Sequence, residues 1–301
     1  MSEQVISVRG LHKSYGEVEA VRGVDLEVER GEIFAFLGPN GAGKTTTVST
    51  LEGYLGRDGG EVSVLGTDPA ASDRAWRARI GFVLQECRME PLLSVRETLD
   101  LYAGYYAAPR DVAETIELVG LTEKADARAG SLSGGQQRRL DVAVALIGDP
   151  ELLFLDEPTT GFDPSARRQA WEVIGGLRDL GKTVFLTTHY MEEAQALADR
   201  VAVISAGRIV ATGTPDDLGG RGEAPTTISF DPPDGDLDGL LEGEWAFEAG
   251  RHVLRTRTPV PDLQRLTSRA LERGVQLPML EVRRPSLEDV YLELTGGGRD
   301  Q

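Results

Sequence analysis

Residues 36–51, FLGPNGAGKTTTVSTL, place a glycine-rich turn between an apolar run and a segment that opens with a lysine and three threonines. The apolar residues 33–37 predict a buried strand, and a helix is expected to begin at Thr45. The turn fits the pattern G-x-x-x-x-G-K-[ST] of a phosphate-binding loop, in which backbone N–H groups and the positive end of the helix dipole converge on phosphate oxygens. The stretch therefore predicts a strand, a phosphate-binding turn and a helix.

The side chains of this turn suit a bound triphosphate. Gly41 and Gly43 carry no side chain that could block the phosphates, and the Lys44 ammonium is a compact charge that can reach between the β- and γ-phosphates. The Thr45 hydroxyl is expected to hold Mg²⁺. An ordinary glycine-rich turn is the alternative, but the chain contains only four lysines, which disfavours a chance match. The expected nucleotide-binding residues of the turn are Gly38, Pro39, Asn40, Gly41, Ala42, Gly43, Lys44, Thr45 and Thr46.

The composition limits the possible functions. With 301 residues the chain can bury a large core and has room for a second, small domain. The formal net charge of -17 argues against nucleic acid as the main partner, because binding phosphate backbones requires clustered lysine and arginine. The single cysteine, Cys87, cannot form an internal disulfide.

The sequence also carries no sign of membrane insertion. The opening residues MSEQVISVRG lack the charged and apolar regions of a signal peptide, and no apolar run approaches the roughly 18 residues of a membrane span. We therefore expect a cytoplasmic protein that reaches a membrane only through a partner.

The order of apolar segments predicts an α/β fold with an added β layer. The segments VISVRG and VDLEVE predict strands of an antiparallel layer with one solvated face. Apolar strands then alternate with helices through IFAFLG, IGFVLQ, LLFLDE and TVFLTTH, which is typical of a mostly parallel sheet. Residues 92–145, approximately, have a helical pattern and predict an inserted helical subdomain, whereas VAVISAGRIVATG predicts a strand hairpin.

The predicted domain boundaries follow a change in composition. The stretch TPDDLGGRGEAP is rich in glycine, proline and acidic residues, which indicates a linker. We expect a catalytic domain at residues 1–217, a linker at 218–225, a small α+β domain at 226–296 and a tail at 297–301.

The small domain has its own strand and helix signals. TTISF, WAFEAGRHVLRTRT and VQLPMLEVRR predict strands. A helix is expected from about Pro261 to Arg273, where Gly274 ends it. Ser286 followed by Asp289 predicts the capping-box-like start of a last helix.

Two adjacent carboxylates follow the apolar run in LLFLDEPTTG. The run brings Asp156 and Glu157 to the carboxyl end of a predicted central strand, which is the sheet edge where ligands bind in α/β folds. There Asp156 is expected to coordinate Mg²⁺, directly or through water, and Glu157 to polarise the water that attacks the γ-phosphate. A solvated Asp-Glu pair is the alternative for this segment alone, and the phosphate-binding loop disfavours it.

A second glycine-rich turn occurs in SLSGGQQRRLDVAVALIGDP and runs into a predicted helix. It is a second potential phosphate clamp. One triphosphate does not need two such clamps on one chain, so the second is expected to serve a nucleotide on another copy. LSGGQ at residues 132–136 resembles the signature of the ATP-binding-cassette (ABC) ATPases, and the resemblance covers about residues 5–217.

This resemblance implies a head-to-tail homodimer with two ATP molecules at its interface. Each ATP would be held by the phosphate-binding loop of one copy and by Ser133, Gly134 and Gly135 of the other, with Gln136 beside them.

Further residues receive roles by the same resemblance. Tyr15 in KSYG would stack on adenine, with simple packing as the alternative, and Gln85 in VLQE would contact Mg²⁺ and the attacking water. Asp163 in GFDP would contact the opposite copy, and Phe162 replaces the commoner leucine there with little expected consequence. His189 at the end of TVFLTTH resembles the switch histidine of the family, whose imidazole can donate a hydrogen bond to the transferring phosphoryl group.

The resemblance also implies a separate membrane permease as partner, with a helix that docks near residues 85–99. For MEPLLSVRETL within this range, the plain entry to the helical subdomain is the equally open alternative. RRPSLEDVYLELTGG resembles the tail of ATPases of bacterial drug and polysaccharide exporters, particularly the daunorubicin-resistance type. An exporter of drug-like or lipid and polysaccharide substrates is therefore expected, at the cytoplasmic face of the membrane. Residues 286–294 of this tail have three open interpretations, namely a regulatory contact, a dimer clasp or an inert cap.

A non-transport ATPase acting on ribosomes or DNA is the competing function. DNA-tethering members of the superfamily carry long coiled coils between loop and signature, yet Leu132 comes only 88 positions after Lys44, without sustained heptads. Translation factors of the superfamily usually carry two cassettes, whereas this sequence has one phosphate-binding loop, and its acidity disfavours RNA. The sequence favours transport and does not name the cargo.

Overall fold

A computed structural model of the chain describes residues 3–83, 89–233, 241 and 244–295. The chain divides into two compact units, Met1–Pro215 and Asp216–Gln301. Among the helices in these described ranges, none is both long and apolar enough to span a bilayer.

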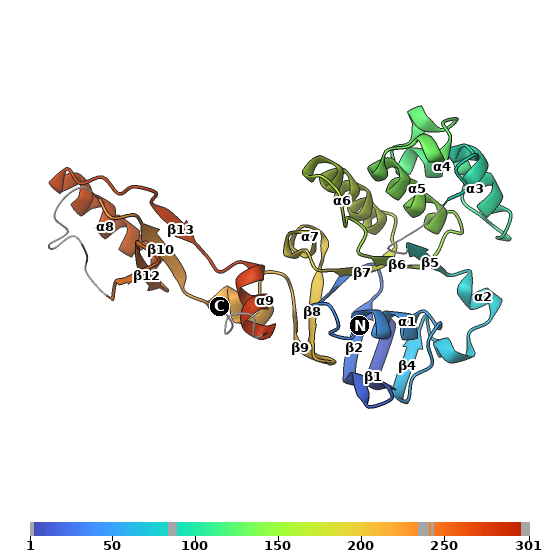
Figure 1. Cartoon of the computed structure of the whole chain (residues 1–301), viewed down its shortest axis with the longest axis horizontal. Coiled ribbons are helices and arrows are strands. Elements are labelled where there is room, and N and C mark those ends of the chain that lie inside the picture. The colour runs from blue at the N-terminus through green and yellow to red at the C-terminus, as the bar shows by residue number, and fades with distance from the viewer. Residues whose placement is uncertain (1–2, 84–88, 234–240, 242–243, 296–301) are drawn as a thin grey trace. The chain divides into compact units, whose positions relative to one another are not determined.

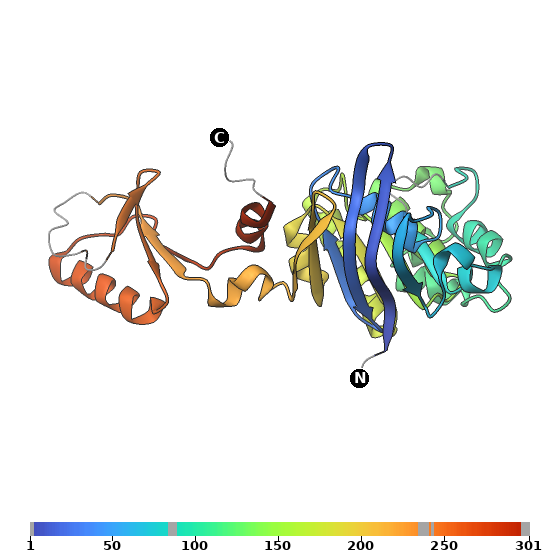
Figure 2. The ribbon, with the colours of Figure 1, turned by 90° about the horizontal axis from the view of Figure 1, so that it is seen from below.

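An antiparallel sheet opens the first unit. Its order is β2-β1-β4, with β1 (Gln4–Tyr15), β2 (Val18–Glu29) and β4 (Gly59–Val64). Along β2, Val24, Leu26 and Val28 are buried while the acidic residues between them are exposed, because successive side chains of a strand point to opposite faces. Figure 2 shows β1 and β2 side by side. The expected antiparallel layer is confirmed.

The central sheet of the first unit has the order β5-β6-β7-β3-β8-β9. The strands are β3 (Ile33–Leu37), β5 (Ile80–Val83), β6 (Leu152–Asp156), β7 (Thr183–Thr188), β8 (Arg200–Ser205) and β9 (Arg208–Gly213). The first five in this order pair in parallel, and β9 pairs antiparallel with β8 as the expected hairpin. Strands β3 and β7 are buried throughout, which explains why β3 is entirely apolar and β7 contains only apolar residues and threonine. Because β7 lies between β3 and β6, the residues that follow these three strands meet at one sheet edge.

Helices cover the central sheet and build a separate lobe. Between β5 and β6 the chain forms α3, α4 and α5, which Figure 1 shows grouped together. Their side chains Val95, Leu99, Ile116 and Leu140 belong to one buried cluster, so the expected helical insertion is confirmed. The helices of this unit are α1 (Lys44–Leu51), α2 (Arg74–Arg77), α3 (Val95–Ala103), α4 (Val112–Leu118), α5 (Gly134–Leu146), α6 (Pro164–Asp179) and α7 (Met191–Leu197), with short 3₁₀ turns η1 (Pro69–Ala71), η2 (Thr122–Lys124) and η3 (Ala129–Ser131).

The second unit packs one helix on a small antiparallel sheet. The sheet order is β11-β12-β10-β13, with β10 (Thr226–Phe230), β11 (Ala246–Glu248), β12 (Arg251–Thr256) and β13 (Glu281–Arg283). Helix α8 (Pro259–Arg273) buries Leu266 and Ala270 in the same cluster as Ile228, Phe230 and Leu254. It ends at Gly274 in the left-handed conformation, as the sequence indicates. Helix α9 (Leu287–Thr295) follows the reciprocal bonds between Ser286 and Asp289.

Two features of this unit differ from the sequence-based expectation. The predicted strand at 275–284 is reduced to β13, because Pro278 has no N–H to donate and Met279 adopts a left-handed φ of 51°. The predicted linker contains the 3₁₀ turns η4 (Leu218–Glu223) with Leu218 buried. Gly219 permits this packing, because a Cβ there would lie 2.6 Å from the Val290 side chain of α9.

Candidate active site

The phosphate-binding turn is held by close backbone packing. Gly43 caps α1 with a φ of 104°, and a Cβ at this position would lie 2.5 Å from the carbonyl oxygen of Ala20 on β2. A Cβ at Gly38 would lie 2.5 Å from the carbonyl oxygen of Ile204 on β8. Only glycine fits at both places. The turn therefore delivers the first N–H groups of α1, which have no partner inside the helix, to one side of the sheet edge.

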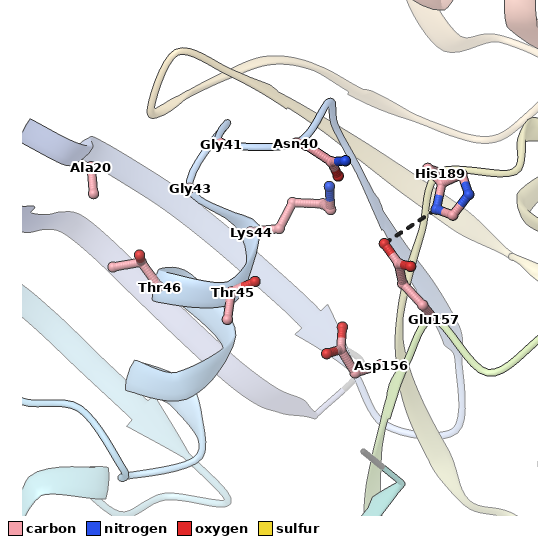
Figure 3. Close-up of a pocket in the computed structure, with 10 residues that line it drawn as sticks. All are labelled: Ala20, Asn40, Gly41, Gly43, Lys44, Thr45, Thr46, Asp156, Glu157 and His189. Atoms are coloured by element: carbon pink, nitrogen blue, oxygen red, sulfur yellow. Dashed lines mark ion pairs between the residues drawn. The ribbon is translucent and has the colours of Figure 1, made fainter. Parts of the chain in front are cut away.

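A cavity of about 620 Å³ opens beside this turn. It is lined by residues from β2, the turn, α1 and the ends of β6 and β7, and Figure 3 shows all ten of them. The lining residues are Ala20, Asn40, Gly41, Gly43, Lys44, Thr45, Thr46, Asp156, Glu157 and His189. The structure thus brings together the three sequence segments for which phosphate, metal and water chemistry is predicted.

Lys44 lies under the turn with its ammonium group toward the cavity (Figure 3). The residue is only 8% exposed, and its Nζ donates hydrogen bonds to the carbonyl oxygens of Gly38 at 2.6 Å and Pro39 at 3.2 Å. Burial lowers the pKa of Lys44, while the negative charges of Glu157 and Asp156 oppose that shift. A cation buried in this way supplies a strong local field for an anionic ligand.

Glu157 and His189 face each other across the ends of β6 and β7. The Nδ1 atom of His189 lies 3.2 Å from Oε1 of Glu157, the contact drawn in Figure 3. The hydroxyl of Thr160 donates to the other carboxylate oxygen of Glu157 at 3.1 Å. Both oxygens of this carboxylate are therefore oriented by neighbours, as positioning of a reacting water requires.

Comparison with known proteins agrees with this geometry. A family model described as ABC transporter matches residues 21–160. The chain is also 38% identical to the daunorubicin resistance ATP-binding protein DrrA2 of Streptomyces coeruleorubidus, over 98% of this chain and 96% of that protein. The chain belongs to the ABC transporter family. It is an ABC ATPase, and the bound nucleotide of this family is ATP.

Two further relatives extend the comparison. This ABC ATPase is 42% identical to the Nod factor export ATP-binding protein I of Rhizobium sp. (strain N33), over 98% of both chains. Among solved structures, it resembles a dimeric post-hydrolysis state of the ATP-binding cassette MJ0796 bound to ADP and Pi, with a TM-score of 0.61 and 26% identity over 69% of this chain and 98% of that one. The central fold is therefore that of an ABC cassette.

Several residues to which the sequence assigned ABC functions lie outside the cavity lining. Ser133 is the N-cap of α5, where its side chain and that of Gln136 form a capping box around Gly134 and Gly135. The side chain of Asp163 caps α6 by accepting from the N–H groups of Ser165 and Ala166. Other residues outside the lining are Gly38, Pro39 and Ala42 within the turn and the half-exposed Tyr15 at the end of β1, while Gln85 lies outside the described residues.

The structure shows contacts around the cavity of this ABC ATPase that the sequence did not indicate. Thr160 contacts Glu157, as described above. Glu193 on α7 is fully buried, and its Oε1 accepts hydrogen bonds from the hydroxyl of Thr159 at 2.7 Å and the indole N–H of Trp171 at 3.1 Å. These two hydrogen bonds connect α7 to α6 and to the loop that follows β6. The only sequence signal for Glu193 is its place on the first turn of a short helix after His189.

Glu52 at the end of α1 is another buried carboxyl group of this ABC unit. Burial, followed by the nearby charge of Asp156, raises the pKa of Glu52 to about 7. Since the folded chain holds this proton more tightly than the unfolded chain, the contribution of Glu52 to stability falls as the pH rises from about 4.5 to about 7.

Replacing Glu52 by glutamine is therefore expected to raise the free energy of unfolding at pH 8 by an amount on the order of 2 kcal/mol, and by less at pH 5. Urea unfolding of both proteins at the two pH values measures this difference. Glu117→Gln, at an exposed position on α4, is the matched control and should change little. A gain of equal size at both pH values would contradict the titration of Glu52.

Proposed function

We propose that the chain is the ATP-binding and ATP-hydrolysing subunit of an ABC exporter, in which two copies close around two Mg-ATP and drive a separate membrane permease. The observation that carries this proposal is the placement of Glu157, oriented by His189, across one cavity from Lys44. A binding module without catalysis has no need of a carboxylate held by two partners beside a phosphate site.

The catalytic roles follow from position in the cavity. Lys44 and the N–H groups at the start of α1 bind the β- and γ-phosphates. Glu157 polarises the water that attacks the γ-phosphate, and His189 orients Glu157 by donating from Nδ1. In its imidazolium form His189 also donates from Nε2 to a phosphoryl oxygen. The attacking water must lie in line with the leaving oxygen of ATP. The hydrolysis rate therefore depends on where the Glu157 carboxylate holds that water.

Thr45 and Asp156 fit a magnesium site. Both line the cavity, and Figure 3 shows their side chains directed into the space between α1 and β6. Mg²⁺ binds through one or two protein oxygens plus phosphate oxygens and water, rather than through an all-protein cage. Among the described residues, no group of three or more histidine, cysteine or acidic side chains is placed so that it could hold a metal ion. When bound, Mg²⁺ would neutralise charge on the phosphates, and Gln85 is proposed to contact it.

The second half of each site is proposed to come from another copy. Ser133, Gly134, Gly135 and Gln136 do not line the cavity of their own chain, which leaves them available to the nucleotide of a head-to-tail partner, with Asp163 at the contact. The cassette of known structure named above is described as dimeric, which supports this arrangement. Half-exposed Tyr15 is proposed to stack on adenine.

The partner and cargo are inferred from the named relatives. Their names refer to daunorubicin resistance and Nod factor export, which supports export of drug-like or lipid and polysaccharide substrates. The chain would then work at the cytoplasmic face of the membrane, bound to its permease and not to nucleic acid. An ATPase acting on ribosomes or DNA is the second candidate, and no described feature of the site favours it.

The shared-site geometry makes a prediction about mixed dimers. Lys44→Ala and Ser133→Ala proteins should each be inactive alone, but a mixed dimer contains one composite site with both residues intact. Random pairing makes about half of the dimers mixed, and each mixed dimer has one working site out of two. The mixture should therefore recover roughly a quarter of wild-type ATPase activity. Phosphate release from each variant and from the mixture measures this. If differently tagged copies exchange and the mixture stays inactive, the shared site is wrong.

The proposal as a whole is tested by capture of the partner. Glu157→Gln protein carrying a tag is expressed in its native host and trapped with Mg-ATP, and the membranes are gently solubilised before mass spectrometry of what co-purifies. A polytopic membrane protein at comparable abundance supports transport and identifies the cargo-bearing subunit. Ribosomal or DNA-bound proteins without one would support the second candidate instead.

A further inference from the structure

Thr187 is a buried hydroxyl residue directly beside the two carboxylates of the site. In the parallel pairing of β6 and β7, Thr187 stands opposite Asp156. Thr187 is 1% exposed, and it is not among the ten residues that line the cavity. It therefore cannot reach a bound nucleotide, and any role in the reaction must pass through its neighbours.

The hydroxyl of Thr187 makes two different hydrogen bonds. It donates its proton to Oδ1 of Asp156, and it accepts the backbone N–H of Glu157 at 3.2 Å. A hydroxyl has one proton and two lone pairs, so both bonds can exist at once. The same N–H of Glu157 also donates to the backbone carbonyl of Thr187 at 3.0 Å, which makes a three-centre bond. One residue thus contacts the side chain of Asp156 and the backbone of Glu157.

The backbone at Glu157 needs such support. Its φ is 45°, in the left-handed region that residues with a side chain rarely adopt. Residues stay in this region only where surrounding contacts hold them there. At Glu157 the three-centre bond to Thr187 is the contact made by the backbone N–H. This turn directs the carboxylate of Glu157 toward His189.

We propose that Thr187 is a positioning residue for ATP hydrolysis, which fixes the Asp156 carboxylate and the Glu157 turn together through one hydroxyl. This inference rests on the proposed function for the metal-binding role of Asp156 and the catalytic role of Glu157. Because Oδ1 of Asp156 is held by the hydroxyl, the remaining oxygen of that carboxylate has a defined direction into the cavity. Without the hydroxyl, Asp156 loses a charge-assisted bond and Glu157 keeps only its bond to the carbonyl.

The test compares Thr187→Val, which keeps the shape and removes the hydroxyl, with Thr187→Ser, which keeps the hydroxyl. The first readout is amide hydrogen exchange of the nucleotide-free protein in peptides that contain Glu157. The second is the Mg²⁺ concentration that half-saturates ATP hydrolysis, measured together with kcat. Thr187→Val should exchange about tenfold faster, need about tenfold more Mg²⁺ and lower kcat, while Thr187→Ser should stay near wild type in all three.

Thr183→Val is the matched control. Thr183 lies on the same face of β7 at its other end, is fully buried, and its hydroxyl accepts the N–H of Gly31 at 2.9 Å. Loss of the Thr183 hydroxyl should lower thermal stability without changing amide hydrogen exchange at Glu157 or the Mg²⁺ requirement.

Three outcomes would overturn the inference. They are wild-type exchange in Thr187→Val, equal defects in Thr187→Val and Thr187→Ser, or the same changes in Thr183→Val. The exchange readout does not depend on the catalytic roles. If Glu157→Gln hydrolyses ATP normally while Thr187→Val still exchanges faster, the proposed catalysis fails and the positioning contact stands.

Discussion

Replacing Glu157 by glutamine is expected to lower the ATP turnover number by about a hundredfold or more while leaving ATP binding near its wild-type strength. The amide has almost the same shape, and its oxygen can still accept the bond that Thr160 donates to the carboxylate. It carries no negative charge, however, and cannot accept a proton from the attacking water. The loss should therefore fall on the chemical step and not on the affinity for nucleotide. Phosphate release at saturating Mg-ATP, together with calorimetric titration of ATP, measures both quantities.

Glu151→Gln provides the control for this carboxylate-to-amide change. Glu151 pairs with Arg30 and Arg79 at the other end of β6 and does not line the cavity. Its replacement should leave turnover within about twofold of wild type, because partly exposed ion pairs contribute little. Near-normal turnover in Glu157→Gln would remove Glu157 as the catalytic base, and a loss of ATP affinity there would show that the charge acts mainly in binding.

Replacing Lys44 by alanine is expected to weaken ATP binding by about tenfold to a hundredfold, because a hydrogen-bonded charge facing the phosphates is lost. The effect arises in binding itself, and turnover should fall as a consequence. Lys44 also donates to the carbonyl oxygens of Gly38 and Pro39, so the variant leaves two acceptors of the turn without this donor. Titration with ATP and with ADP measures the loss, which should be larger for ATP because the ammonium reaches the γ-phosphate.

Lys182→Ala separates this effect from the general cost of removing a buried lysine. Lys182 is 9% exposed and pairs with Asp149 at 2.8 Å, away from the cavity lining. This variant should melt at a lower temperature and bind ATP normally. An unchanged ATP affinity in Lys44→Ala, in protein that melts like wild type, would argue against the phosphate-binding function of the turn.

The sequence predicts much of this fold because its central strands are continuous apolar runs. Strands β3 and β7 are buried on both faces, so every position is apolar or a small threonine, and the signal does not depend on periodicity. The contact between β6 and β7 could not be predicted in the same way. It depends on strand order and register between segments about thirty residues apart, and the hydrogen bond of Thr187 to Asp156 exists only in that register.

The sequence predicts the parts of the candidate site in which a motif fixes the local backbone geometry. It does not predict the parts that depend on how a helix or loop packs against the rest of the unit. The turn around Lys44 and the carboxylates after β6 follow from local sequence, and the structure brings them to one cavity. The burial of Glu193 and Glu52 does not follow from it, since carboxyl side chains in or beside helices are mostly exposed. Tertiary packing alone decides that these two carboxyl groups face inward.

The close packing of Gly38 and Gly43 against backbone oxygens of Ile204 and Ala20 has an entropic consequence. When a loop becomes ordered only on binding, the loss of its conformational entropy weakens the affinity for the ligand. In this chain the turn is already anchored to β2 and β8, and a hydrogen bond from the N–H of Gly207 to the carbonyl of Ala42 holds its middle. The loop is preorganised, so nearly all of the interaction between ATP and its N–H groups remains available for affinity.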